Sequence, residues 1–230
     1  MASAIIVAAG KSLRMNHTTR KQYLMLAGRP ILSRTLRVFD ACDDVERITL
    51  VVSETDVDFC RNEILPQAGL TTRIELVPGG KERQDSVYNG LRAMDGPKKG
   101  IVVIHDGVRP FIQQKQLTAC IAGARDTGAC ILGIPISDTL KQLDKAGYIQ
   151  KTVNRAAIWQ AQTPQAFEFD LILKAHHRAR QDGHRGTDDA LLVERMGKRI
   201  KVINGSKKNI KITTREDLSL ALAIIQTQNQ

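Results

Sequence analysis

The stretch Ala4-Ile-Ile-Val-Ala-Ala-Gly10 decides the fold that we predict for this chain. Ile5, Ile6 and Val7 are β-branched and no polar residue interrupts them, which is typical of a strand buried on both faces of a parallel sheet. The small residues up to Gly10 follow at once, so a ligand can lie directly on the main chain there. We therefore predict a buried first strand that ends in a small-residue turn.

A loop rich in cations follows this turn. Arg14 and Lys21 bring two positive charges close to it in sequence. Exposed backbone N–H groups at such a turn form a concavity that binds anions, so the segment favours a triphosphate cradle over a plain turn with solvated cations. The loop lacks both the G-x-G-x-x-G dinucleotide fingerprint and the Walker pattern G-x-x-x-x-G-K-[ST]. It resembles instead the signature of sugar-nucleotide and polyol-phosphate nucleotidyltransferases, small-small-Gly-x-x-x-Arg-Met followed by a Lys.

The composition is that of an ordinary soluble globular protein. Of the 230 residues, 42% are hydrophobic and 25% are charged, and no shift in composition asks for a second domain, so we predict one domain over residues 1–230. No apolar run approaches the roughly 18 residues of a membrane helix, and the first strand leaves no room for a signal peptide. The scattered cysteines favour buried free thiols in a reducing compartment. We expect a cytoplasmic protein.

The formal net charge of +10 admits several kinds of partner. Nucleic acid, an acidic membrane and small polyphosphates all attract basic proteins. Here the cations are dispersed, and only 4% of the residues are aromatic, so few side chains could stack on bases. A small phosphorylated substrate fits best, and we expect neither nucleic acid nor a membrane as a partner.

The hydrophobic pattern predicts strands that alternate with amphipathic helices. We expect a helix around 57–65 to stop before Pro66, because the residue before a proline disfavours helical backbone. Residues 137–155 interrupt the alternation, since two short alternating runs joined by a turn rich in Asp and Gly predict a hairpin that contacts another subunit. The further expected strands are 48–52, 73–77, 101–104, 129–135 and a buried last strand at 200–203, and the further expected helices are 30–40, one following 79–86, 114–125, 168–182, 187–196 and 215–226.

Two segments predict ligand contacts where strands end. The segment Gly79-Gly-Lys-Glu-Arg-Gln-Asp-Ser86 places two glycines and nearby cations ahead of a helix. This pattern indicates a site that binds an anion and the edge of a nucleotide base. The alternative is an ordinary loop whose Ser and Asp cap the helix. Asp106 lies beyond strand 101–104, where open α/β sheets bind ligands. It could meet Mg²⁺ beside substrate phosphates, meet a ribose hydroxyl, or pair with Arg109. Thr187 is either a helix N-cap or a substrate contact.

Motifs in one order cover almost the whole chain, from about residue 4 to 225. They are Ala8-Ala-Gly10 with Arg14-Met15, Lys21-Gln-Tyr-Leu24, Gly79-Gly-Lys-Glu-Arg83 with Ser86, His105-Asp-Gly-Val-Arg-Pro110, Asp138-Thr139, Arg155, Trp159-Gln-Ala-Gln-Thr-Pro-Gln165, Thr187-Asp188 and Asn209-Ile-Lys-Ile-Thr213. This set strongly resembles the 2-C-methyl-D-erythritol 4-phosphate cytidylyltransferase family of the non-mevalonate route to isoprenoid precursors. The resemblance implies a three-layer, doubly wound, Rossmann-like, mostly parallel α/β sheet, similar to nucleotide-diphospho-sugar transferases, with a projecting β-hairpin arm.

The resemblance also implies an activity, a cofactor and a set of site residues. The implied reaction joins CTP to a polyol phosphate with release of pyrophosphate and use of Mg²⁺, in a homodimer held through the hairpin arms. The implied catalytic residues are Arg14, Lys21, Arg155 and Lys211, and Asp106 is a candidate metal ligand beside the substrate phosphates. The implied nucleotide-binding residues are Ala8, Ala9, Gly10, Lys21, Gly80, Lys81, Arg83, Ser86, Asp106 and Gly107. The implied acceptor-binding residues are Asp106, Arg109, Thr139, Arg155, Thr163, Thr187 and Lys211.

The chain departs from the family pattern at a few positions, and rival functions stay open. Val7 and Arg20 stand where relatives commonly have Pro, Ser12 where Gly is usual, and Gly107 where Ala is frequent. None of these changes removes a charged group, so we expect them to affect the rigidity of the loop and the rate of the reaction. Arg20 adds a cation next to Lys21 and could shift the position of that lysine. The nearest rival is ribitol 5-phosphate cytidylyltransferase. A basic nucleic-acid-binding protein and a nicotinamide oxidoreductase are more remote.

Overall fold

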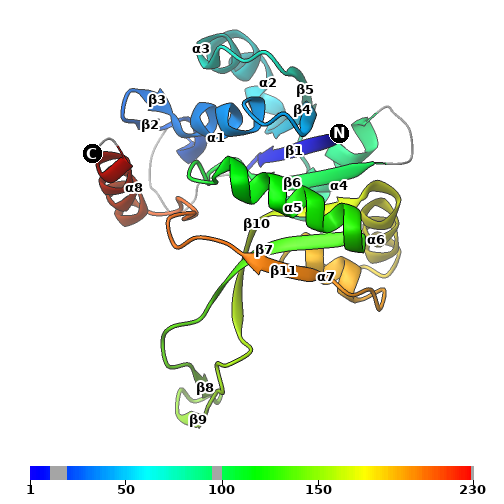
Figure 1. Ribbon diagram of the computed structural model, residues 1–230, viewed down its shortest axis with the longest axis vertical. Helices are drawn as coiled ribbons and strands as arrows, with labels where there is room; N and C mark the ends of the chain where they lie inside the picture. Colours follow the sequence, from blue (N-terminus) through cyan, green and yellow to red (C-terminus); the bar gives the residue numbers. More distant parts are fainter. Residues whose placement is uncertain (11–19, 95–99, 229–230) are drawn as a thin grey trace.

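The computed structural model describes residues 1–10, 20–94 and 100–228. Seven strands form one sheet in the order β11-β7-β10-β6-β1-β4-β5 (Figure 1). All of them run parallel except β10, which pairs antiparallel with both of its neighbours. The strands are β1 Ala2–Ala8, β4 Val45–Val52, β5 Arg73–Pro78, β6 Ile101–Asp106, β7 Ala129–Pro135, β10 Trp159–Glu168 and β11 Lys201–Asn204.

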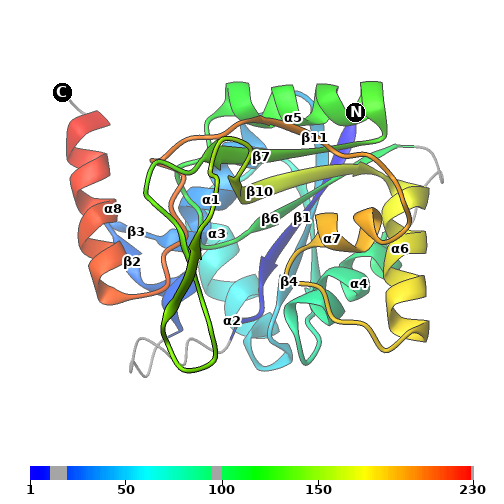
Figure 2. The ribbon, with the colours of Figure 1, turned by 90° about the horizontal axis from the view of Figure 1, so that it is seen from below.

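Helices cover both faces of this sheet, which confirms the predicted three-layer, doubly wound architecture (Figure 2). The alternation of strand side chains separates the two cores, because Ala4 and Ile6 of β1 face one helical layer and Ile5 faces the other. The first layer contains α1 Ile31–Asp40, the helical run α2 Val57–Phe59, η3 Cys60–Ile64 and α3 Leu65–Ala68, and α5 Gln114–Thr127. The second contains α4 Arg83–Ala93, α6 Phe169–Gln181 and α7 Asp189–Glu194.

A third, smaller apolar cluster lies beyond the carboxyl ends of the strands. There α8 Arg215–Gln228 packs its Ala221 and Ile224 against the ladder formed by β2 Met25–Leu26 and β3 Arg29–Pro30 and against the turn that follows β6. Among the described residues, no helix has the length and apolar character needed to cross a membrane.

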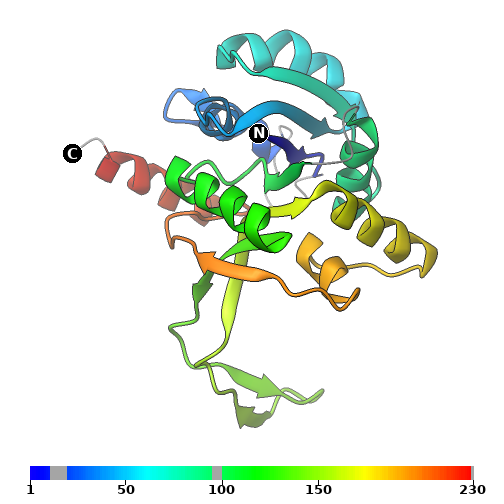
Figure 3. The same cartoon turned by 45° about the vertical axis from the view of Figure 1, so that its right-hand side comes forward.

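Residues 137–155 leave the sheet as an arm (Figure 3). Strands β8 Lys141–Leu143 and β9 Ile149–Thr152 pair antiparallel within it, and every residue of both strands is exposed. The predicted hairpin is therefore confirmed, whereas its contact with another subunit stays a prediction.

Two sequence predictions about elements are wrong, and one of the two alternatives for Thr187 is excluded. The helical run passes through Pro66 instead of ending before it, because Pro66 follows the π-helical stretch Cys60–Ile64, where the α-helical hydrogen-bond ladder is already interrupted. Strand β11 is mostly exposed, because it lies at the edge of the sheet and pairs only with β7. The N-cap of α7 is Asp188 and not Thr187, since the Asp188 side chain accepts the backbone N–H of Leu191.

Candidate active site

Strands β1 and β6 are neighbours in the sheet and end together, with Val7 opposite Asp106. The chain leaves β1 for β4 on one side, whereas β6 lies on the other, so this is the switch point at which open α/β sheets bind ligands. Asp106 is the last residue of β6 and its side chain is only 8% exposed. Its position agrees with the prediction that this residue lies at the ligand-binding edge.

Three cations from distant parts of the chain converge on this one carboxylate. Nε of Arg83, from the first turn of α4, lies 3.2 Å from Oδ1 of Asp106. Nε of Arg109, from the turn after β6, lies 3.3 Å from Oδ2, and Nζ of Lys211 lies 2.9 Å from the same oxygen. We call these four residues the Asp106 cluster. Burial alone would raise the pKa of Asp106, but Arg83, Lys211 and Arg109 more than offset it and hold that pKa well below its ordinary range.

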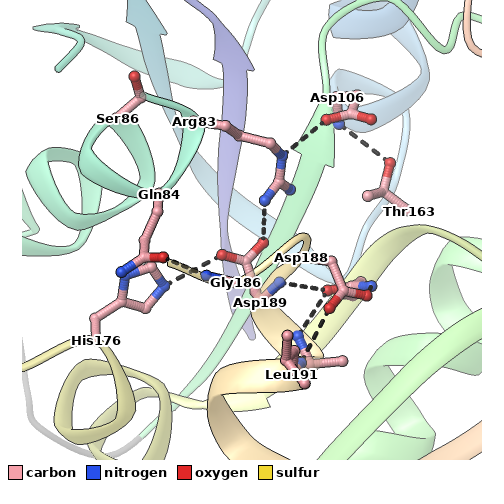
Figure 4. A network of polar contacts seen from close by, with 12 residues as sticks. Arg83, Gln84, Ser86, Asp106, Thr163, His176, Gly186, Asp188, Asp189 and Leu191 are labelled. Atoms are coloured by element: carbon pink, nitrogen blue, oxygen red, sulfur yellow. Dashed lines mark hydrogen bonds and ion pairs between the residues drawn. The ribbon is translucent and has the colours of Figure 1, made fainter. Parts of the chain in front are cut away.

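Arg83 is held by a second buried carboxylate as well (Figure 4). Its Nη1 lies 2.8 Å from Oδ2 of Asp189, which is 1% exposed, and the other Asp189 oxygen lies 3.2 Å from Nε2 of the buried His176. A carboxylate can only accept, so His176 donates here. Nη2 of Arg83 is buried and has no hydrogen-bond partner within the described ranges. Arg83 is thus fixed between two anions through its Nε and Nη1.

Hydrogen bonds to β10 and to the segment after β11 close the other side of the cluster. The backbone N–H of Asp106 donates to Oγ1 of Thr163, whose carbonyl accepts Nδ2 of Asn209 at 2.9 Å. Nη1 of Arg109 donates to the Asn209 carbonyl at 2.8 Å. The family motif predicts that Thr163 contacts the acceptor substrate, and the structure brings its side chain directly against Asp106.

His105 precedes Asp106 and fixes the turn that follows. The residue is fully buried, and its Nε2 donates to the Arg109 carbonyl at 3.1 Å, which holds Arg109 over the carboxylate. Its Nδ1 has no partner among the described residues, so a second ring proton would lack an acceptor. Burial accordingly lowers the pKa of His105 to about 4.

Lys21 lies in η1 Lys21–Tyr23, which is attached to the end of β1. The link is the buried Gln22, whose Nε2 donates to the Ala8 carbonyl at 2.7 Å. The structure therefore brings Lys21 to the same sheet edge as Asp106. Arg14, the other cation predicted for this loop, lies outside the described residues, as does Ser12.

The glycines before α4 are needed for close packing. A Cβ on Gly79 would lie 2.4 Å from Cβ of Ala9, and one on Gly80 would lie 2.3 Å from Cβ of Asp85. Both N–H groups have protein partners, because Gly79 donates to the Val52 carbonyl and Gly80 to Oγ of Ser86. The predicted anion site is therefore not made from free glycine N–H groups. The alternative of a capped loop is correct in part, since α4 has a capping box.

The remaining nucleotide-binding candidates fall into two groups. Gly107 packs closely against Ala8, because an added Cβ would lie 3.1 Å from that residue's methyl group, so the backbone after β6 runs close against the end of β1. Gly10 is exposed, and a Cβ added to it would have no described residue within 4 Å. Lys81 is exposed on the loop before α4.

A cavity of about 460 Å³ opens beside the cluster. Arg109 and Lys211 line it from the cluster side, and Ser137 lines it from the base of the arm. Thr139 and Arg155 are exposed; Arg155 donates to the Ser137 carbonyl, and neither side chain contacts the cluster within the part of the chain that the structure describes.

Thr187 is exposed on the loop ahead of α7. Gln84 fixes this loop, because its amide donates to the His184 carbonyl at 3.1 Å and accepts the Gly186 N–H at 2.9 Å. Sequence reasoning missed Asp189 and His176 as members of the site. The local signal for Asp189 is the pair of acids after Thr187, but acids are also common in the first turn of a helix, so the pair does not by itself indicate a site.

The donor set does not suit a metal ion held by the protein. Both oxygens of Asp106 already face cations at 2.9–3.3 Å, so a metal ion there would meet like charges. In the described ranges, no group of three His, Cys, Asp or Glu residues could hold a metal ion. The geometry favours Asp106 as the centre of an ion-pair cluster that fixes three cations at the end of β6.

Comparisons with known proteins agree with this fold and identify the family. The family model described as 2-C-methyl-D-erythritol 4-phosphate cytidylyltransferase (IspD) matches residues 2–227. An enzyme of that name from Pelotomaculum thermopropionicum is 43% identical over 226 residues, covering 98% of this chain and 94% of the relative. One from Syntrophotalea carbinolica is 46% identical over 223 residues, covering 97% and 95%.

Solved structures give the same result. The crystal structure of 4-diphosphocytidyl-2C-methyl-D-erythritol synthase from Anaerococcus prevotii superposes with a TM-score of 0.87 at 34% identity, covering 98% of this chain and 96% of that one. The 2-C-methyl-D-erythritol 4-phosphate cytidylyltransferase from Thermus thermophilus gives a TM-score of 0.78 at 30% identity, covering 98% and 100%. The match over nearly the whole chain confirms the resemblance seen in the sequence, and this chain belongs to the 2-C-methyl-D-erythritol 4-phosphate cytidylyltransferase family.

Proposed function

We propose that this chain transfers CMP from CTP to 2-C-methyl-D-erythritol 4-phosphate, giving 4-diphosphocytidyl-2-C-methyl-D-erythritol and pyrophosphate in isoprenoid precursor biosynthesis. Membership of the family over residues 2–227 supports the reaction. The observation that carries the proposal is the convergence of Arg83, Arg109 and Lys211 on Asp106 at the switch point of the sheet. Such a cluster presents fixed positive charge where two phosphorylated substrates must meet.

The chemistry needs positioning and charge rather than a covalent intermediate. The acceptor's phosphate oxygen is already a nucleophile at neutral pH, and the obstacle is that one anion must approach the α-phosphate of another. Fixed cations that hold the partners in line and stabilise charge on the equatorial and leaving oxygens lower this barrier. We assign that role to Lys21, at the end of β1, together with Arg14.

The two substrates take opposite sides of the Asp106 cluster in this proposal. Arg83, whose buried Nη2 lacks a partner among the residues described, serves the nucleotide side with Ser86. Arg109 and Lys211 line the cavity of about 460 Å³, which has room for a small polyol. These two side chains supply the positive charge that would bind the phosphate of the polyol. Asp106 offsets the repulsion between these cations and fixes their direction.

Mg²⁺ remains part of the proposal as an ion that enters with the triphosphate. The residues around Asp106 do not suit a metal cage, so oxygens of the substrate would supply most of its ligands. Titrating Mg²⁺ against CTP in the assay tests this, since an ion carried by the triphosphate should be required in proportion to CTP.

We also propose a cytoplasmic homodimer joined through the arm. Leu143, Tyr148 and Ile149 are between 52% and 74% exposed on the arm, and contiguous exposed apolar side chains mark interaction surfaces. The cysteines are free and buried, as expected in a reducing compartment. Sedimentation of the chain and of a Leu143→Glu, Ile149→Glu variant tests the dimer, and a wild-type monomer at micromolar concentration would refute it.

Pyrophosphate release is the direct test of the reaction. The chain should release pyrophosphate from CTP only when 2-C-methyl-D-erythritol 4-phosphate is present, and far more slowly with ribitol 5-phosphate or with other nucleoside triphosphates. Lys21→Ala should remain folded and lose cytidylyl transfer, whereas Lys208→Ala, on an exposed loop, should keep it. Faster turnover with ribitol 5-phosphate would replace our acceptor, and near-normal turnover by Lys21→Ala would remove Lys21 from the mechanism.

A further inference from the structure

The two side chains that flank Lys21 and Gln22 converge on one carboxylate outside the Asp106 cluster. Nε of Arg20 lies 3.2 Å from Oδ2 of Asp56, and the hydroxyl of Tyr23 donates to the same oxygen at 2.9 Å. Asp56 is 14% exposed and ends the short helix η2 Glu54–Asp56. The turn that carries Lys21 is therefore tied down on both sides of that residue.

Neighbouring contacts strengthen this attachment. Nη2 of Arg20 also donates to Oγ1 of Thr55 at 2.9 Å. The Tyr23 hydroxyl is 3.2 Å from Sγ of Cys60, and its ring packs edge-on against Phe59 with ring centroids 5.1 Å apart. Both residues thus contact more than one group of the segment that runs from η2 into the following helical run, so the contact is an extended interface.

Gln22 fixes the turn from the opposite direction. Its amide donates to the Ala8 carbonyl at the end of β1, and Ala8 is opposite Val52, the last residue of β4. Asp56 follows β4 after a short connection, so the two anchors stand at the carboxyl ends of adjacent strands. The backbone that carries Lys21 spans this pair of strand ends and has little freedom to shift along the sheet edge.

We propose that Asp56 is a positioning residue for Lys21, acting through Arg20 and Tyr23 without touching either substrate. The inference rests on the proposed role of Lys21 in cytidylyl transfer. A displacement of about 1 Å of a group that acts in the transition state can cost about 100-fold in rate. We call the contacts of Arg20 and Tyr23 with Asp56 the clamp. Loss of the clamp should therefore reduce turnover far more than it weakens substrate binding.

Asp56→Asn removes the charge with almost no change in size, and Asp58→Asn is its matched control. Asp58 lies in the same segment, is 84% exposed and pairs only with Arg61 among the residues that the structure describes. In pyrophosphate-release assays, Asp56→Asn should lower kcat roughly 10- to 100-fold while KM for CTP and for the acceptor stays within about twofold. Asp58→Asn should match the wild type.

Two further variants dissect the clamp and protect the test against misfolding. Tyr23→Phe removes only the hydroxyl, so it should give a smaller loss of kcat, and combined with Asp56→Asn it should add little, because both act through one contact. Arg20→Lys keeps a cation for Asp56 and should retain most of the activity that Arg20→Ala loses. If Asp56→Asn does not fold, a wild-type kcat in both Tyr23→Phe and Arg20→Ala overturns the proposal.

Amide hydrogen exchange provides a readout that does not depend on catalysis. The N–H groups of Tyr23 and Leu24 donate within the turn, to the carbonyls of Arg20 and Lys21. Their exchange should quicken in Asp56→Asn and stay unchanged in Asp58→Asn. A wild-type protein that does not transfer CMP would overturn the proposed function while leaving the exchange result intact, whereas unchanged kcat and exchange in Asp56→Asn would overturn the clamp alone.

Discussion

Replacing Asp189 with asparagine removes one of the two carboxylates that hold Arg83. The side chain is 1% exposed, lies 2.8 Å from Nη1 of Arg83 and accepts from His176 at 3.2 Å. Removing one partner of a buried ion pair typically costs about 3–5 kcal/mol, and this range is an upper limit here because Asp106 still faces Arg83. For a chain of this size that corresponds to a fall in Tm of roughly 6–20 °C.

The matched control is Asp182→Asn. Asp182 is 43% exposed and its ion pairs with Arg178 and Arg195 lie at 3.9 and 3.4 Å, so its loss should cost only about 0–1 kcal/mol. Urea unfolding followed by far-ultraviolet circular dichroism measures both variants, with equal m-values as the check that two-state unfolding is preserved. Asp189→Asn should also raise KM for CTP, because Arg83 loses an anchor on the proposed nucleotide side.

The pH dependence separates a charge effect from a packing effect. Burial alone would raise the pKa of Asp189, but Arg83 and His176 outweigh it and hold that pKa below its ordinary range. The folded-state pKa is thus below the unfolded one, so the carboxylate stabilises the fold above about pH 4 and this stabilisation is lost as the pH falls further. The difference in unfolding free energy between the wild type and Asp189→Asn should therefore shrink below about pH 4. A gap under about 1 kcal/mol at pH 7, or one that persists undiminished at low pH, would refute the reasoning.

Three further predictions concern other parts of the site. Lys211→Met should raise the acceptor KM roughly 10- to 100-fold, as expected for losing a charge-assisted hydrogen bond, whereas Lys208→Met should leave it unchanged in the same steady-state assay. Because burial lowers the pKa of His105 to about 4, the wild type should lose about 3 kcal/mol of unfolding free energy between pH 6.5 and 4, and His105→Gln should lack that slope in pH-dependent urea titrations. Gly79→Ala should lower Tm sharply, because its methyl carbon would lie 2.4 Å from a neighbouring Cβ, whereas Gly10→Ala meets no described atom within 4 Å and should not.

The local pattern of the chain predicts most of the elements and one end of the site. Unbroken apolar runs such as Ile101 to Ile104 identify buried strands, and Asp106, two residues beyond that run, lies at the ligand-binding edge of a parallel sheet. The short alternating runs of residues 137–155 likewise predict the arm. Periodicity is a property of residues that are neighbours in the sequence, so it can be recognised without the tertiary structure.

The partners of these residues depended on the tertiary structure. Arg83 and Asp189 are 106 residues apart, and Tyr23 and Asp56 are 33 apart, so no local pattern connects them. The exposure of β11 could not be predicted from the sequence either. An edge strand and a central strand can carry the same apolar residues and differ only in how many strands pair with them. The sequence by itself determined which segments became strands and helices and that a charged site would lie beyond β1 and β6. Only the folded chain decided which carboxylate holds which cation, because that choice depends on distances between segments that meet only when the sheet has formed.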